Sequence, residues 1–225
     1  GYNGFGTWEA LNHKNLPTGY GELNLLKNVD NILVAVCVFK AFSIYVDQGV
    51  IVSPVEGGTT ISASDKVIGA VRHLNGQYGT INPESWAKAD NLLFWWDAYS
   101  GVVCQYSSAG IDEVSKYKAY SYFSKLGRLG VQADRQTYKV LGVVHVPFNE
   151  YIMSFSPITV DQVEYPPFTI SYNFAANRWK TYYSYIPEMM CGINTNIVTF
   201  VTGQLFLHTL SPNSRNVFYG AQYNL

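Results

Sequence analysis

Asp90-Asn91-Leu92-Leu93-Phe94-Trp95-Trp96 is the stretch that decides the fold, because a polar turn leads directly into a run of strongly β-forming residues. The same pattern occurs 60 residues earlier, in Asp30-Asn31-Ile32-Leu33-Val34-Ala35-Val36. Weaker copies start at Asn149 and at Thr195. Four related starts in one chain indicate a structure assembled from repeated units.

Each unit also holds a second β-forming run across a short polar or glycine turn, which is the pattern of an antiparallel hairpin. In the third unit the hairpin comes later, so the start at Tyr151 predicts an extra strand. The expected hairpins pair residues 32–39 with 42–46, 92–96 with 102–106, 168–174 with 179–185, and 197–201 with 204–208.

Short β-forming runs at 22–26, 50–54, 85–89 and 110–114 flank the first two hairpins and raise each unit to four strands. Sheets of four antiparallel strands that repeat about every 40 to 50 residues are the blades of a β-propeller. We therefore predict an all-β, β-propeller-like repeat of four-stranded antiparallel blades, either complete or an incomplete piece of a larger propeller. A β-sandwich with similar hairpins is the alternative, because periodicity alone does not determine how sheets close.

One short inserted helix is expected on this β scaffold, at about residues 115–126. Few turn residues occur there, and lysines surround an aromatic face, so we predict a partly exposed helix that contacts another segment. Its apolar residues lie three or four positions apart, at Val114, Tyr117, Tyr120, Phe123 and Leu126. We expect residues 1–19 to be a connecting segment and residues 20–225 to form the propeller-like domain.

Composition excludes several classes of protein. The chain has 225 residues, of which 48% are hydrophobic, 16% aromatic and 14% charged, as in a packed globular protein. The net charge of -1 and the lack of a basic cluster argue against direct nucleic acid recognition. The longest apolar run, 32–39, is far shorter than the roughly 20 residues of a membrane span. A start at Gly1 without Met is typical of a processed product or a piece of a longer polypeptide.

Motifs of catalysis and metal binding are absent from the sequence. It lacks a phosphate-binding loop, a GxSxG elbow, an HExxH helix and paired cysteines of zinc spacing, so we expect no enzyme, cofactor or metal site. We interpret the histidines as strand or loop residues without a second ligand nearby: His13, His73, His145 and His208. We expect the thiols of Cys37, Cys104 and Cys191 to be buried in strands.

Four carboxylates next to β runs are candidates for an acid and base pair: Asp47, Glu84, Asp97 and Glu188. Propeller glycosidases bring such groups together from different blades, without a local motif. The interpretation that we favour is that they are turn residues. Asp97 begins a loop in which its side chain can bond a backbone amide, and the sialidase-type Asp box is absent.

The aromatic stretches, such as Phe94-Trp95-Trp96, have two interpretations. They can belong to the core, or they can form an interface with a sugar or a protein, because Tyr and Trp bury a large area while keeping a polar tip. In a strand, neighbouring side chains point to opposite faces. Alternation therefore predicts that Phe94 and Trp96 share one face and Trp95 the other, with only one of the two faces in the core.

Several longer segments are specific enough to compare with a known family. They are Tyr78-Gly79-Thr80-Ile81-Asn82-Pro83-Glu84-Ser85, Leu93-Phe94-Trp95-Trp96-Asp97 with Gly101, Arg178-Trp179 through Pro187-Glu188, Gly203 through His208, and Asn216-Val217-Phe218-Tyr219-Gly220. These segments resemble stretches of large virion proteins of crAss-like tailed bacteriophages, and the resemblance spans about residues 20–223.

The resemblance implies a β-rich protein of the muzzle or hub at the far end of a short tail, with motifs of packing and turn chemistry rather than of catalysis. It implies that Gly79 and Gly101 form turns, that Pro83 and Pro187 end strands, and that Trp179 and Phe218 are buried anchors. The structural motif residues are Tyr78, Gly79, Pro83, Glu84, Ser85, Asp97, Gly101, Arg178, Trp179, Pro187, Phe218, Tyr219 and Gly220.

The leading hypothesis is a structural component of a bacteriophage tail, located in the virion, that assembles with other tail proteins and with its own copies in a symmetric ring. The alternative is a propeller that binds or depolymerises glycans of the host surface. A cellular propeller scaffold is a third hypothesis. Scaffolds of this kind end each repeat with a Trp-Asp pair. This sequence has one such pair, Trp96-Asp97, which weakens the third hypothesis.

Overall fold

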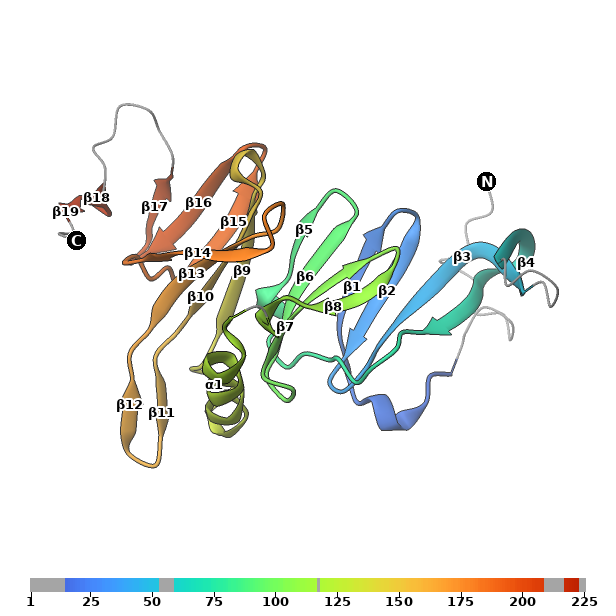
Figure 1. Cartoon of the computed structure of the whole chain (residues 1–225), viewed down its shortest axis with the longest axis horizontal. Coiled ribbons are helices and arrows are strands. Elements are labelled where there is room, and N and C mark those ends of the chain that lie inside the picture. Colours follow the sequence, from blue (N-terminus) through green and yellow to red (C-terminus); the bar gives the residue numbers. More distant parts are fainter. Residues whose placement is uncertain (1–14, 53–58, 117, 209–216, 223–225) are drawn as a thin grey trace. The chain divides into compact units, whose positions relative to one another are not determined.

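The computed structural model describes residues 15–52, 59–116, 118–208 and 217–222, without the side chains of residues 47–52, 59–67 and 222. His13, Tyr117 and the side chain of Asp47 lie outside this part. The chain divides into two compact units, Gly1–Gly79 and Thr80–Leu225. Both consist of antiparallel sheets in which strands adjacent in sequence pair with one another (Figure 1).

The first unit holds one four-stranded meander. Its strands pair in chain order: β1 (Leu23–Val29), β2 (Ile32–Cys37), β3 (Ala41–Val52) and β4 (Thr59–His73). Asp30 and Asn31 form the turn between β1 and β2, with φ angles of 49° and 63° that these residue types tolerate better than most. Ala35, Cys37 and Phe42 form a buried cluster on one sheet face.

The second unit begins with another four-stranded meander, in which Asp90 takes the same left-handed turn conformation, with φ of 47°. Its strands are β5 (Ala87–Ala89), β6 (Leu92–Asp97), β7 (Val102–Ser107) and β8 (Gly110–Glu113). The two Asp-Asn turns that define the sequence repeat therefore occupy the same place, before the second strand of each sheet, although Asn31 has a positive φ and Asn91 does not.

The predicted helix is present but lies further along the chain. Helix α1 spans Tyr120–Gln132, whereas Val114–Lys116 form a separate 3-10 turn. Lys118 has a φ of 67°, which a right-handed helix does not allow, so the helical face expected from Val114 onward is interrupted there. Tyr120 and Tyr122 are exposed, while Phe123 is buried against Trp96, Phe155 and Trp179 from other strands. As predicted, the helix is partly exposed and contacts other segments.

A third meander follows the helix, with a small hairpin inserted between its second and third strands. The four strands are β9 (Val140–His145), β10 (Glu150–Phe155), β13 (Phe168–Asn173) and β14 (Arg178–Tyr183), and the inserted pair is β11 (Ile158–Val160) and β12 (Val163–Tyr165). The strand expected at Tyr151 is thus a central strand of the sheet, between β9 and β13.

The last elements are a three-stranded meander and a short hairpin. The meander contains β15 (Met189–Ile193), β16 (Asn196–Val201) and β17 (Gln204–Leu207), and the hairpin pairs β18 (Val217–Phe218) with β19 (Ala221–Gln222). Tyr219 packs on Phe206 and its hydroxyl donates to Thr199 Oγ1 at 3.1 Å, so the hairpin docks on the three-stranded sheet.

All four predicted hairpins are present, and the described chain is mostly β with several four-stranded antiparallel sheets. Among the described residues no sheet closes on itself, and a propeller arrangement is not shown. Of the separate strand expected at residues 50–54, residues 50–52 instead belong to β3, which continues to Val52 and pairs with the longer β4, and residues 53 and 54 lie outside the described part. Within the described residues, no helix combines the length and apolarity needed to cross a bilayer.

Within the second unit, the sheets stack face to face through β9 and β10. A Cβ atom at Gly142 of β9 would lie 1.8 Å from the carbonyl oxygen of Ser85, so only glycine allows this approach. The Tyr151 hydroxyl donates to the same oxygen at 2.5 Å. Beside this contact the ring of Phe94 stacks on Tyr151, with centroids 4.9 Å apart. The second and third meanders are thereby joined.

The alternation expected for Phe94, Trp95 and Trp96 is wrong, because all three side chains are fully buried. Alternation of buried and exposed residues requires a sheet with one face in water, and strands covered on both faces lose that pattern. Strand β10 behaves in the same way, since all six of its residues are buried. Phe94, Trp95 and Trp96 therefore belong to the hydrophobic core on both faces of β6.

The prediction of buried thiols is correct for Cys37 and Cys104 and wrong for Cys191, although all three cysteines are free. Burial raises the pKa of the Cys37 and Cys104 thiols, which keeps them protonated and unreactive. Cys191 is exposed because it lies on the largely exposed face of the β15–β17 sheet.

Replacement of Gly142 by Ala tests the close contact between the two meanders. The added methyl group meets backbone that cannot move independently of its sheet, so we expect the free energy of unfolding to fall by about 3 kcal/mol or more. Gly192→Ala is the matched control, since its Cβ would lie 3.5 Å from the nearest atom and should change stability by no more than about 1 kcal/mol. Urea unfolding measures both, and equal effects would refute the contact.

Candidate functional site

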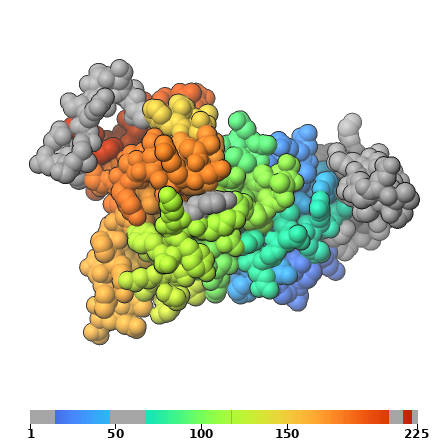
Figure 2. Space-filling view, in the orientation of Figure 1, coloured from blue at the N-terminus to red at the C-terminus, as the bar shows by residue number. Residues whose placement is uncertain are grey.

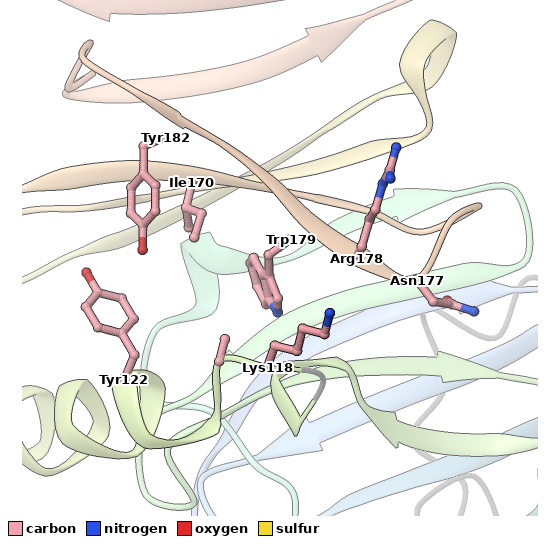
Figure 3. A pocket seen from close by; sticks show the side chains of 8 residues that line it. Lys118, Tyr122, Ile170, Asn177, Arg178, Trp179 and Tyr182 are labelled. Carbon is pink, nitrogen blue, oxygen red and sulfur yellow. The ribbon is translucent and has the colours of Figure 1, made fainter. Parts of the chain in front are cut away.

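An open groove lies between the N-terminal end of α1 and the β13–β14 hairpin. Its volume is about 570 Å³. In Figure 2 the orange residues of β13 and β14 lie beside the yellow-green residues of the helix region, and Figure 3 shows the side chains between them. The groove is lined by Lys118, Ala119, Tyr122, Ile170, Asn177, Arg178, Trp179 and Tyr182.

A β-bulge in β14 places its aromatic residues in the groove. Ser171 pairs with Thr181 but Tyr172 pairs with Trp179, so Lys180 is an extra residue in the ladder. In a regular strand, residues three positions apart point to opposite faces. Because of the bulge, Trp179 and Tyr182 instead share the face of their partners on β13, and both line the groove.

The groove combines aromatic surface with positive charge. The hydroxyls of Tyr122 and Tyr182 point toward each other and hydrogen bond, and burial together with this neighbour raises the pKa of Tyr122. Lys118 and Arg178 lie at the other end of the groove (Figure 3), and the lining includes no Asp or Glu. Such a surface suits a ligand with flat apolar faces and acceptor or anionic groups.

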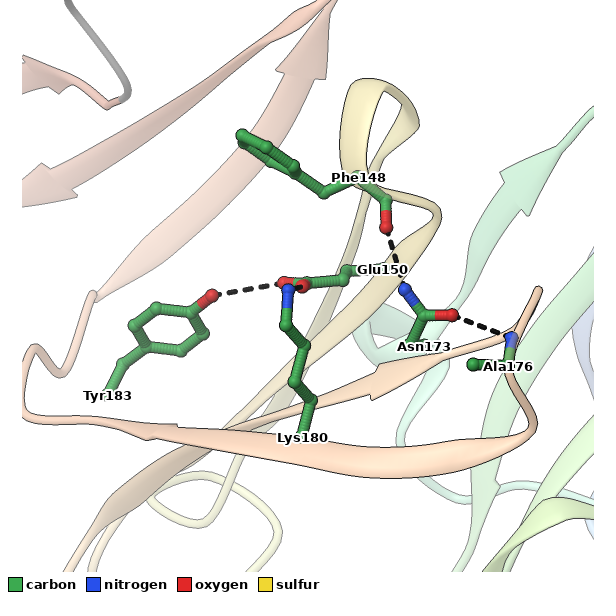
Figure 4. A network of polar contacts seen from close by, with 6 residues as sticks. All are labelled: Phe148, Glu150, Asn173, Ala176, Lys180 and Tyr183. Atoms are coloured by element: carbon green, nitrogen blue, oxygen red, sulfur yellow. Dashed lines mark hydrogen bonds and ion pairs between the residues drawn. The ribbon is translucent and has the colours of Figure 1, made fainter.

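The other face of β14 takes part in a polar cluster around Glu150. This carboxylate is almost fully buried at the start of β10, and Lys180 Nζ donates to its Oε1 at 2.5 Å. The Tyr183 hydroxyl donates to Oε2 at 3.0 Å, so both oxygens are paired (Figure 4). The bulge thus serves both faces, because it also brings Lys180 and Tyr183 to the same carboxylate.

Aromatic packing encloses this cluster. The Lys180 ammonium lies 5.8 Å from the centroid of the Phe148 ring, and Asn173 donates to the Phe148 carbonyl oxygen at 2.9 Å. Proximity to the Glu150 charge and, above all, burial raise the pKa of Tyr183. The cluster therefore holds a buried negative charge in a network of donors, the arrangement that such a charge requires.

Two histidines lie at the edge of the same region. Burial lowers the pKa of His145 from its usual 6.5, with Glu150 opposing this shift and Lys180 reinforcing it. Burial and the charge of His145 lower the pKa of His208. His208 contacts Thr199 Oγ1 at 2.7 Å and packs on Tyr185. At neutral pH both rings are uncharged.

The three candidate carboxylates whose side chains are described, Glu84, Asp97 and Glu188, do not form one cluster. Glu84 pairs with Lys139 at 3.6 Å, and Glu188 lines a second cavity of about 280 Å³ together with Lys139. Asp97 is buried at the end of β6, where its Oδ1 accepts the Ser100 N–H at 3.2 Å, as a turn residue does. No group of His, Cys, Asp and Glu suitable for a metal ion occurs among the described residues.

The motif residues of the Tyr78–Ser85 segment have packing roles. Tyr78 is half-buried, and a Cβ at Gly79 would lie 2.0 Å from the Val38 carbonyl oxygen, so Gly79 serves close packing. Pro83 starts the 3-10 turn Pro83–Ser85, which also contains the exposed Glu84. The Ser85 hydroxyl donates to Asn82 O at 2.7 Å and accepts from Trp96 N at 3.0 Å, which fixes the turn against β6.

The remaining motif residues lie at turns and contacts of the second unit. Gly101 has a φ of 65° and packs against Ser124 of α1, and Gly220, with φ of 77°, turns the β18–β19 hairpin. Pro187 is buried beside the second cavity. Phe218 is half-buried, with its ring 5.0 Å from that of Tyr185. Trp179 is half-buried, and with Arg178 it lines the groove.

Sequence reasoning missed Glu150, Lys180 and the pairing of Tyr122 with Tyr182. Glu150 begins an apolar run, but the residue pattern does not show that both faces of this strand are covered, so the sequence gives no signal for the burial of Glu150. The role of Lys180 depends on the bulge, which leaves no mark in the residue pattern.

The fold defines a β-rich protein of meander sheets, and its motif residues serve packing and turns. A family model described as the Crassvirus muzzle protein matches residues 9–202, and the chain belongs to this family. The resemblance to virion proteins of crAss-like phages is thereby confirmed, as is the virion tail as the location of the protein. The comparison with curated proteins finds no match.

Glu150→Gln tests the buried cluster. The substitution removes the charge that Lys180 neutralises and sets an amide against a donor, so we expect the free energy of unfolding to fall by about 1 to 3 kcal/mol. The matched control is Glu84→Gln, because its exposed ion pair with Lys139 should contribute less than about 1 kcal/mol. Urea unfolding at neutral pH compares them, and a Glu150 variant as stable as the control would contradict this role.

The two histidines predict acid sensitivity. Their pKa values are lowered in the folded protein, so below about pH 6.5 the unfolded chain binds more protons. Stability from this source is complete above that pH and is lost as the pH falls toward the folded values.

We therefore expect urea midpoints to fall between about pH 7.5 and pH 5.5, and to fall less in His208→Gln. His73→Gln, which alters an exposed ring bonded to Tyr20, should keep the wild-type pH dependence. A His208→Gln protein with an unchanged pH dependence would disprove the assignment.

Proposed function

We propose that this chain is a structural module of the muzzle or hub at the distal end of the phage tail, where it assembles with other virion proteins and with its own copies in a symmetric ring. The family match carries this proposal. The stacked sheets support it, because such packing gives a rigid body whose faces can serve as contacts. A ring needs only one repeated heterologous contact between identical subunits.

The proposal includes the absence of enzymatic activity. The two cavities of the second unit support it in different ways. The groove between α1 and β14 is lined without a carboxylate, and the cavity beside Glu188 contains Lys139, which already pairs with Glu84. Hydrolysis of a glycosidic bond requires two carboxyl groups on either side of the bond.

Cross-linking mass spectrometry on purified particles tests the structural role. We expect cross-links from exposed lysines, such as Lys88 and Lys125, to other tail proteins and to other copies of the chain. Cross-links confined to single copies of the chain would count against the proposal.

A second candidate function is the binding of a host-surface glycan in the groove. The pairing of Tyr122 with Tyr182 beside Trp179 favours it, because such rings offer flat faces and polar edges to a sugar. Arg178 and Lys118 add positive charge, which favours an anionic polysaccharide. The geometry supports binding rather than depolymerisation.

For this second function, Tyr182→Ala should weaken binding of the chain to anionic polysaccharide from the host surface by about tenfold. Tyr120→Ala is the matched control, since Tyr120 is an exposed tyrosine of the same helix that does not line the groove. Titration calorimetry measures both. Equal affinities of the two variants would exclude the groove as the binding site.

A further inference from the structure

The β15–β17 sheet has one largely exposed face, on which Val198 of the central strand is buried. Strand pairing assigns side chains to this outer face, because residues directly opposite each other point to the same side. Met189, Ile193 and Leu205 are 59%, 54% and 60% exposed. The outer face consists of Met189, Cys191, Ile193, Asn196, Val198, Phe200, Leu205 and Leu207, and it carries no charge among these described residues.

The inner face of the same sheet is already an interface between sheets. Met190 and Ile197 pack on Leu141, Val143 and Ile152 of the neighbouring meander. The sheet is therefore apolar on both faces. Sheets with this composition are usually covered on both sides, as strands β6 and β10 are in this protein. Exposed apolar surface of this kind marks an interaction site.

The first meander of the chain offers a second open apolar face. Leu16 and Tyr20 cover part of it, over the buried Ala35, Cys37 and Phe42. Other described residues of this face are partly exposed. Leu23 and Leu26 on β1 are 50% and 47% exposed, and the half-buried residues beside them are Leu33, Ile44 and Val71.

We propose that the partner of the outer β15–β17 face is a second copy of this chain, which contributes its open β1–β4 face. This contact joins copies of the chain head to tail. The proposal rests on the tail role proposed above and adds the surfaces through which the copies meet. Pairing of like faces would cover one open face and leave the other in water, whereas a head-to-tail contact covers both. It continues the stacking of sheets on sheets that already operates between β9 and β15 within the chain.

The small amount of charge on the described residues of the two faces supports this choice. The outer β15–β17 face carries none, and the β1–β4 face has the His73 ring, bonded to Tyr20, with the Lys40 ammonium 5.2 Å from the centroid of the Tyr20 ring. Two largely apolar sheets can stack while such groups at their borders keep their partners or stay in water. A head-to-tail contact forms a ring if the rotation between copies closes, and an open filament if it does not.

Sedimentation velocity of the full chain at increasing micromolar concentrations tests the proposal, with a reductant present because Cys191 is a free thiol on the outer face. We expect reversible self-association. Leu205→Glu on one face and Leu26→Glu on the other should each weaken it by about tenfold or more. Val163→Glu, an equally exposed substitution on β12, is the matched control and should associate as the wild type does.

Mixing the two face variants identifies the contact. Leu205→Glu keeps an intact β1–β4 face and Leu26→Glu keeps an intact β15–β17 face, so an equimolar mixture should form one-to-one dimers that grow no further. The three residues that are changed, the control included, are exposed, so circular dichroism and urea midpoints should match the wild type.

Four results would overturn the proposal. The first three are a wild-type chain that stays monomeric, face variants that associate as well as Val163→Glu, and a mixture that forms no dimer. Self-association lost in Leu205→Glu alone would show pairing of like faces and would also overturn it. A monomeric chain that nevertheless cross-links to tail proteins in the particle would refute this contact and leave the structural role intact.

Discussion

The second unit depends on one close approach of two backbones. Gly142 of β9 lies directly on the turn that ends at Ser85, and the Tyr151 hydroxyl donates to the same carbonyl oxygen. This contact sets the separation and register of two meanders, so that Phe94 meets Tyr151 and Trp96 meets Phe155. A contact between two backbones cannot be relieved by a change of side-chain conformation. The contact at Gly142 therefore determines where the strands that pack on β9 lie.

Stacking also explains how the protein uses its polar residues. A buried charge between sheets is tolerated only where donors surround it, and the bulge at Lys180 supplies them to Glu150 while it turns Trp179 toward the groove. One irregularity in one strand therefore builds both the buried cluster and the open groove. The chain belongs to the muzzle family, whose place is the virion tail.

The sequence predicted the local structure well, because turn chemistry is local. The Asp-Asn turns and the β-forming runs predicted the hairpins and the four-stranded sheets, and the quoted motifs indicated the family correctly. It predicted the environment of single residues less well. Trp95 and Cys191 lie in similar β runs, yet one is fully buried and the other exposed, since burial depends on which sheets cover a strand. The start of α1 and the bulge at Lys180 depend on single backbone conformations that many sequences allow. The propeller arrangement stays a prediction about how sheets close.

Cryo-electron microscopy of the distal tail tests the central claim most directly, which is that this protein acts through stacked sheets whose open faces join neighbouring subunits. The account predicts density in which the β5–β8, β9–β14 and β15–β17 sheets keep their stacking and in which another sheet covers the outer face of Met189, Ile193 and Leu205. A tail in which this face is bare toward solvent, with the chain held only through its loops, would contradict it.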